Sequence, residues 1–194
     1  MLKIGLTGGV GSGKTYVSLI FSNLGVPIFY ADLEAKKILS NNILVQKEIN
    51  QNFGVDIFNN GVFDKEKLSN IIFNDKEKLK TLNSFIHPLV NEEFNKWCKS
   101  QDSKYVIKEA AIIFEEKTNL NLDKVICVIS DKKTKILRLI KHRQISEIQI
   151  LNIMKNQMLD NDKIVLSDFI INNNPNKMIL PQVIKIHKKI NSII

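Results

Sequence analysis

The stretch Met1-Leu-Lys-Ile-Gly-Leu-Thr-Gly-Gly-Val-Gly-Ser-Gly-Lys-Thr-Tyr16 decides the fold. A short apolar run from Leu2 to Leu6 is broken by glycines, and an amphipathic helical pattern follows. Between the two, Gly8 to Thr15 satisfies G-x-x-x-x-G-K-[ST], the pattern of a phosphate-binding loop that joins a strand to a helix. A flexible N-terminal turn with a chance lysine is the alternative, but the flanking strand and helix argue against it. The sequence therefore predicts that the chain binds a nucleoside triphosphate.

The spacing within this loop has a mechanical reason. Glycines let backbone N–H groups turn inward and approach phosphate oxygens without side chains in the way. The following helix adds its free N–H groups and the positive end of its dipole. We expect Lys14 to reach the β- and γ-phosphates and the Thr15 hydroxyl to bind Mg²⁺. Contacts to the nucleotide are expected from Gly8, Gly9, Val10, Gly11, Ser12, Gly13, Lys14, Thr15 and Tyr16.

Composition indicates a soluble globular protein of one or two domains. The chain has 194 residues, of which 44% are hydrophobic and 25% charged. No apolar run approaches the roughly 20 residues that span a bilayer, and a start directly on a strand predicts no signal peptide. Cys98 and Cys127 form no CxxC pattern and sit among apolar residues, so we expect buried thiols. The sequence predicts a cytoplasmic protein that does not bind membranes.

The charge pattern is more informative than the net charge. A formal charge of +8 suggests nucleic-acid binding, but the lysines are spread along the whole chain, so we predict no nucleic-acid partner. Arg138 and Arg143 are the only arginines in a lysine-rich sequence. A planar guanidinium can donate two parallel hydrogen bonds to phosphate oxygens, whereas an ammonium acts as a point charge. We therefore predict that both arginines bind phosphates. The alternative is that they are surface residues on a basic helix.

The order of elements predicts an α/β fold with a parallel sheet of five strands. The expected strands are Leu2–Leu6, Val26–Tyr30, Lys104–Glu109, Val125–Ile129 and Phe169–Ile171. Later helices are expected over Asp131–Lys141, over Ser146–Met158 and from about Asn176.

Between the second and third strands the patterns are helical, without a strand of note. Asp64 and Asp75 should cap helices, Asn59–Gly61 should turn, and His87-Pro88 should interrupt a helix. We expect this helical insertion to bind a second substrate.

Two acidic residues follow predicted strands. Asp32 comes just after the second strand, and Glu109 ends the third. In open α/β sheets, ligands bind beyond the carboxyl ends of the strands, so both residues should lie at the edge that carries the phosphate loop. We favour a catalytic role for Asp32, with an N-cap of the next helix as the alternative. Glu109 stands where a P-loop enzyme places its carboxylate on the magnesium side.

Taken together, these segments resemble the dephospho-CoA kinase family from end to end. The matching segments are Gly5–Thr15 (the phosphate loop), Tyr30-Ala-Asp32 (Asp-Ala-Asp in the family), Leu82–Val90 (Leu-Asn-x-Ile-x-His-Pro-x-Val), Glu109–Glu115 (Asp-x-Pro-Leu-Leu-Phe-Glu), Arg138–Arg143 (the lid helix, R-L-x-x-R in the family and with one more residue between the arginines here) and Ser167–Asn172 (Ala-Asp-x-Val-Ile-x-Asn in the family, with the asparagine here directly after the isoleucine pair). The chain departs from the family at Tyr30, Glu109 and Ala111, which replace two aspartates and a proline.

The resemblance implies a P-loop NTP hydrolase-type three-layer fold with a helical substrate-binding insertion and a helical lid. The expected parts are a nucleotide-binding core of residues 1–31, 102–131 and 167–194, an acceptor-binding insertion of residues 32–101, and a lid of residues 132–166. The implied activity is ATP-dependent phosphorylation of the ribose 3′-hydroxyl of dephospho-CoA, which yields coenzyme A, with Mg²⁺. A monomer or a small homo-oligomer is expected.

The resemblance also implies roles for individual residues. Asp32 would take the proton from the acceptor hydroxyl, while Lys14 and Arg143 would supply positive charge. Thr15 would bind the metal. The remaining implied contacts are Arg138 and Asn172 (or Asn173) to ATP, and Thr7, Asp32, His87 and Glu109 to the acceptor. His87 has a structural role as its alternative, and His142 and His187 are expected to be solvated residues without a role.

Three other functions compete with this interpretation. A GTPase would need D-x-x-G and N-K-x-D, but no aspartate has glycine three positions later, and Asn176-Lys-Met-Ile179 ends in isoleucine. Another P-loop small-molecule kinase, such as a nucleoside monophosphate or shikimate kinase, shares the fold and the loop. A nucleic-acid-binding ATPase is the third.

Overall fold

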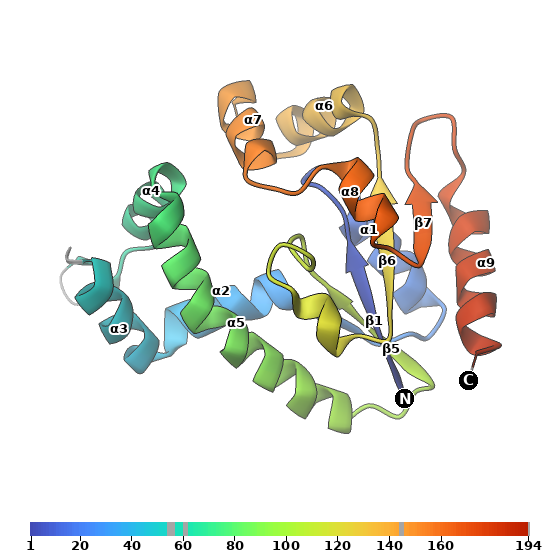
Figure 1. Cartoon of the computed structure of the whole chain (residues 1–194), viewed down its shortest axis with the longest axis horizontal. Helices are drawn as coiled ribbons and strands as arrows, with labels where there is room; N and C mark the ends of the chain where they lie inside the picture. The colour runs from blue at the N-terminus through green and yellow to red at the C-terminus, as the bar shows by residue number, and fades with distance from the viewer. Residues whose placement is uncertain (54–56, 60–61, 144–145, 194) are drawn as a thin grey trace. The chain divides into compact units, whose positions relative to one another are not determined.

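Five apolar strands form one parallel sheet in the order β2-β5-β1-β6-β7 (Figure 1). They are β1 (Leu2–Thr7), β2 (Ile28–Tyr30), β5 (Tyr105–Glu109), β6 (Lys124–Ile129) and β7 (Phe169–Asn172). Each strand begins and ends within two residues of its predicted run. The predicted α/β fold with a parallel sheet of five strands is therefore confirmed.

The computed structural model describes residues 1–53, 57–59, 62–143 and 146–193, without the side chains of Asn59, Lys65, Phe73, Asn74, Lys76 and Arg143. Contacts divide the chain into two compact units. The sheet unit comprises Met1–Tyr30 and Gln101–Ile194, and the helical unit comprises Ala31–Ser100. No helix in the described part of the chain is long and apolar enough to cross a membrane.

Helices and an irregular segment cover the two faces of the sheet. Because successive strand residues point to opposite faces, Ile4 and Leu6 pack on one side with α1 (Lys14–Asn23) and α9 (Ile179–Asn191). Gly5 faces the other side, where a Cβ would lie 2.8 Å from the Leu122 side chain. Leu122 lies near the end of the segment between β5 and β6, which contains a 3₁₀ turn at Thr118–Asn121. On the sheet, α8 (Asp160–Val165) contacts β6.

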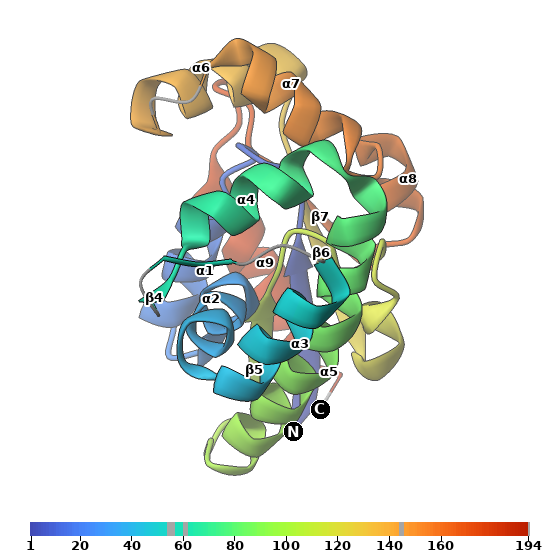
Figure 2. The ribbon, with the colours of Figure 1, turned by 90° about the vertical axis from the view of Figure 1, so that its left-hand side faces the viewer.

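The helical unit consists of α2 (Ala31–Asn41), α3 (Ile43–Phe53), α4 (Lys65–Asn74) and α5 (Lys76–Lys99), with a small hairpin of β3 (Phe58–Asn59) and β4 (Val62–Phe63) (Figure 2). The two predicted caps are confirmed: Asp64 accepts from the Lys67 N–H at 2.9 Å, and Asp75 accepts from the Glu77 N–H at 3.0 Å. The hairpin was not predicted, because strands of two residues are too short to show an alternating pattern. Residues 60 and 61 of the predicted turn lie outside the described residues.

The predicted interruption at His87-Pro88 is wrong, since α5 runs through Pro88. A proline inside a helix removes one backbone hydrogen bond and crowds the preceding turn. Five residues of α5 at a spacing of four are nevertheless buried along its length: Leu82, Ile86, Val90, Phe94 and Cys98. This apolar stripe packs the helix on both sides of the proline, so tertiary burial outweighs the local cost.

Beyond the carboxyl end of β6 lie α6 (Lys132–Arg143) and α7 (Glu147–Lys155) (Figure 1). Ser146 begins α7 with a capping box that includes Gln149. The helix ends at Lys155 and not at Met158 as predicted, and α8 was not predicted at all. Between α7 and α8, Gln157 accepts the Val10 N–H and the Met158 N–H donates to Glu115. A helical pattern in the sequence does not reveal such contacts.

The prediction that His187 is solvated is wrong. The ring is half-buried, with Nδ1 at 2.7 Å from the Tyr105 hydroxyl and Nε2 at 3.1 Å from the Asn191 amide nitrogen. Burial lowers the pKa of His187 below its ordinary value. Protonation would also turn the accepting ring nitrogen into a donor, so the folded protein favours the neutral imidazole.

We expect this histidine to make stability depend on pH. The unfolded pKa is about 6.5 and the folded pKa lies below it, so its contribution is complete above pH 6.5 and is lost as pH falls through the folded pKa. Thermal melts of the wild type between pH 7 and 5 should therefore show a steeper loss than melts of His187→Gln. The exposed residue His142 supplies the control, since His142→Gln should keep the wild-type slope. Equal slopes for the wild type and His187→Gln would contradict this account.

Candidate functional site

The phosphate loop lies between the end of β1 and the start of α1, at the carboxyl edge of the sheet. Gly8 and Gly13 have φ values of +149° and +92°. A Cβ on Gly8 would lie 2.2 Å from the Val128 carbonyl oxygen, and one on Gly13 would lie 2.2 Å from Nδ2 of Asn173. Both positions therefore need glycine, for the backbone conformation and for space.

The side chains of the loop are arranged as an anion site requires. Lys14 Nζ donates to the Gly8 carbonyl oxygen at 2.9 Å, so the ammonium lies across the loop. Ser12 is fully buried, and its hydroxyl has no hydrogen-bond partner among the described residues. A buried hydroxyl without a partner is costly unless a ligand satisfies it, and a phosphate oxygen would do so. Thr15 and Tyr16, which follow Lys14 in the sequence, are exposed.

Asn173 connects this loop to α6. Its Nδ2 donates to the Ser12 carbonyl oxygen at 2.7 Å. Arg138 Nη2 donates to the carbonyl oxygen of Asn173 at 2.9 Å and to its Oδ1 at 3.2 Å. The side chain of Asn172 instead accepts from the Asn174 N–H at 3.1 Å, within a turn. Of the two asparagines named from the sequence, Asn173 is thus the one that contacts the loop.

Two cavities lined by residues of the loop include most of the predicted nucleotide contacts. The first has a volume of about 550 Å³ and is lined by Gly11, Gly13, Lys14, Thr15, Tyr16, Arg138, Leu139, His142, Asn173 and Ile179. The second has a volume of about 440 Å³ and is lined by Gly9, Val10, Ser130, Lys132, Lys135, Leu151, Met154, Lys155, Gln157, Met158, Leu159 and Asp160. Asn172 lines neither cavity, whereas His142, which was given no role, lines the first.

Two of the predicted acceptor contacts lie at the same sheet edge. Glu109 is buried at the end of β5, in register with Leu6 on one side and Tyr30 on the other. Thr7, the residue before the loop, is buried, and its hydroxyl donates to the Ala111 carbonyl oxygen at 3.3 Å.

The helical unit holds the other two. Asp32 is exposed in the first turn of α2, which begins at Ala31, so it is not the N-cap proposed as its alternative. His87 is half-buried within α5. Arg143 ends α6, but its side chain lies outside the described residues.

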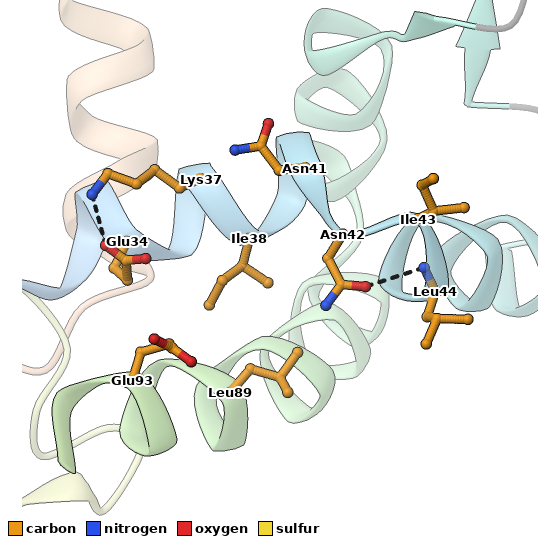
Figure 3. A pocket seen from close by; sticks show the side chains of 9 residues that line it. All are labelled: Glu34, Lys37, Ile38, Asn41, Asn42, Ile43, Leu44, Leu89 and Glu93. Atoms are coloured by element: carbon orange, nitrogen blue, oxygen red, sulfur yellow. Dashed lines mark hydrogen bonds and ion pairs between the residues drawn. The ribbon is translucent and has the colours of Figure 1, made fainter. Parts of the chain in front are cut away.

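The helical unit also has a cavity of its own, with a volume of about 480 Å³, at the corner of α2 and α3 over α5 (Figure 3). Ile38 and Leu89 face each other across it, and Asn42 turns its Oδ1 to the Leu44 N–H at 3.1 Å (Figure 3). The lining residues are Glu34, Lys37, Ile38, Asn41, Asn42, Ile43, Leu44, Leu89 and Glu93. None of them was predicted to be a site residue.

Comparison with known proteins gives a consistent result. The family model described as dephospho-CoA kinase matches residues 2–178. A dephospho-CoA kinase of Fusobacterium nucleatum is 37% identical over 91% of this chain and 91% of its own length, and one of Bacteroides fragilis is 31% identical over 95% and 91%. The solved structure of a dephospho-CoA kinase from Campylobacter jejuni is 26% identical, with a TM-score of 0.70 over 98% of this chain and 97% of that one.

Proposed function

The chain belongs to the dephospho-CoA kinase family, and from this premise we propose that it transfers the γ-phosphoryl group of ATP to the ribose 3′-hydroxyl of dephospho-CoA. The observation that carries the proposal is the family match over residues 2–178. This range contains the phosphate loop, the whole helical unit and all five strands. The products would be ADP and coenzyme A.

ATP would bind along the phosphate loop, with its phosphates held by the backbone N–H groups and by Lys14. The buried Ser12 hydroxyl would then gain a partner. Arg138 and Asn173 are already joined to each other and to the loop, which supports a role for them in shaping the first cavity for the nucleotide. We infer that Asn173 takes the role for which Asn172 was named.

In the transfer step, the acceptor 3′-oxygen forms a bond to the γ-phosphorus as the bond to the β,γ-bridging oxygen breaks. The proton of the hydroxyl passes to the Asp32 carboxylate, and ADP leaves with the bridging oxygen. Lys14 and Arg143 would stabilise the charge on the phosphoryl oxygens during this exchange. The exposure of the Asp32 side chain is consistent with a group that meets a substrate.

Mg²⁺ fits the residues at this loop. Thr15 lines the first cavity, and its hydroxyl would bind the ion together with phosphate oxygens of ATP. When bound, the ion would neutralise phosphate charge.

The remaining assignments rest on the family and on position in the sequence. Residues 1–31, 102–131 and 167–194 would form the core, residues 32–101 the acceptor-binding part and residues 132–166 the lid. Thr7, Glu109 and His87 would contact the acceptor. A cytoplasmic monomer or small homo-oligomer without nucleic acid is part of the same proposal.

A panel of acceptors tests the function. ATP consumption would be followed by a coupled assay with dephospho-CoA, the four common nucleoside monophosphates, and shikimate. Dephospho-CoA should give the highest kcat/KM. If a nucleoside monophosphate or shikimate is preferred, the alternative P-loop kinase is the correct assignment.

A further inference from the structure

A short segment that runs from the end of α7 into α8 contacts two separate parts of the sheet unit. We call residues 157–163 the anchor segment. It begins just after α7, which ends at Lys155, and it ends inside α8. Its contacts reach the phosphate loop on one side and the segment after β5 on the other. The proposed mechanism uses none of its side chains.

The first set of contacts fixes the phosphate loop. Gln157 Oε1 accepts the Val10 N–H at 2.8 Å. Asp160 pairs with Lys135, and the Lys135 ammonium is so near Gly9 that a Cβ there would lie 3.0 Å from it. The anchor segment therefore binds Val10 directly, and its ion pair with Lys135 lies against Gly9.

The second set is centred on Lys163, whose side chain is fully buried. Its Nζ donates to the Ala111 carbonyl oxygen at 2.9 Å and pairs with Glu115 Oε1 at 2.8 Å. Glu115 Oε1 also accepts the Met158 N–H at 2.9 Å, so the carboxylate binds the anchor segment at both ends. A buried ammonium is tolerated only when it is paired in this way.

Ala111 is contacted both by the anchor segment and by the residue that precedes the phosphate loop. Its carbonyl oxygen accepts from Lys163 and also from the hydroxyl of Thr7, the residue immediately before the loop. Ala111 lies two residues after Glu109, the buried carboxylate at the end of β5. The Ala111 carbonyl group thus links three parts of the chain. They are Thr7 at the start of the phosphate loop, the segment that follows Glu109, and Lys163 near the end of the expected lid.

We propose that Lys163 is a positioning residue for phosphoryl transfer, which acts through the Ala111 carbonyl to hold the phosphate loop and Glu109 in register. The inference rests on the proposed function, since it assumes that the phosphate loop holds the phosphates of ATP and that Glu109 contacts the acceptor. Lys163 touches no substrate in this role. Its effect should fall on the rate of transfer, because small displacements of reacting groups reduce rates strongly while ATP contacts along the loop persist.

Two variants separate positioning from stability. Lys163→Met removes the ammonium and leaves Glu115 charged and buried, which should lower the melting temperature. The double variant Lys163→Met/Glu115→Gln removes both charges but keeps an acceptor for the Met158 N–H, so its melting temperature should recover. The control is Lys124→Met, which breaks an exposed pair of the same 2.8 Å length with Asp168. All rates would be measured well below the lowest melting temperature.

Lys163→Met should reduce kcat by about 10²-fold, with KM for ATP changed by less than about threefold. The double variant should regain its melting temperature but keep the low kcat, because the donor to Ala111 is still missing. Lys124→Met should have normal kinetics. If kcat recovers together with the melting temperature, or never falls in Lys163→Met, the residue is only structural and the inference is wrong.

Hydrogen–deuterium exchange keeps this inference separable from the function. If the wild type does not phosphorylate dephospho-CoA, the proposed function fails, and exchange then decides the inference alone. Peptides covering residues 5–16 and 109–117 should exchange faster in Lys163→Met and in the double variant than in the wild type or Lys124→Met. Unchanged exchange in both peptides would overturn the positioning role.

Discussion

Lys14→Ala is expected to reduce kcat by about 10²–10³-fold, the usual loss when one preorganised charge contact to the transition state is removed. The Lys14 ammonium already lies across the loop, 2.9 Å from the Gly8 carbonyl oxygen, where the transferring phosphate would bind. Alanine is a good helix former, so the first residue of α1 should tolerate the change and the protein should stay folded.

Turnover and a thermal melt would be measured side by side for Lys14→Ala. Lys185→Ala is the matched control, since it removes an exposed lysine of α9 in the same unit. The control should keep wild-type turnover. A folded Lys14→Ala enzyme that retains more than about a tenth of the wild-type rate would contradict the role, because the contact would then be worth less than such contacts are.

Asp32→Asn should show the second large effect, a fall in kcat of roughly 10²–10⁴-fold, which is the usual contribution of a positioned general base. Asparagine keeps the size of the side chain but cannot take the proton from the acceptor hydroxyl. ATP binding should survive, because the loop and Lys14 hold the phosphates. The melting temperature should fall only slightly, by the loss of one favourable charge in the first turn of α2.

Glu34 offers a close control for this variant, because it is the other acidic residue in the first turn of α2. Glu34→Gln also removes a negative charge from the turn, and with it an ion pair to Lys37. Its melting temperature should fall at least as far as that of Asp32→Asn, while its kcat stays near the wild-type value. Normal turnover in Asp32→Asn would remove Asp32 from the mechanism.

The parts of the fold that the sequence predicted are those with a local cause. The five strands are continuous apolar runs, and the caps Asp64 and Asp75 bind N–H groups only two or three residues away. The phosphate loop is equally local, since its glycines and Lys14 act within eight consecutive residues.

What the sequence did not reveal depends on distant partners. Pro88 is tolerated because α5 is packed along its whole length, and a local pattern contains no such information. The contact between Asn173 and Ser12 spans 161 positions, and that between Gln157 and Val10 spans 147. The buried ammonium of Lys163 had no signal either, because lysine is common throughout this chain.

The proposed function requires that this chain phosphorylates one hydroxyl of one acceptor. The most direct measurement is ³¹P NMR of the product formed from ATP and dephospho-CoA by the wild-type enzyme. A ribose 3′-phosphomonoester resonance, growing in step with ADP and absent with Lys14→Ala, is the predicted result. Consumption of ATP without that resonance, or a phosphate on any other position of the acceptor, would contradict the account.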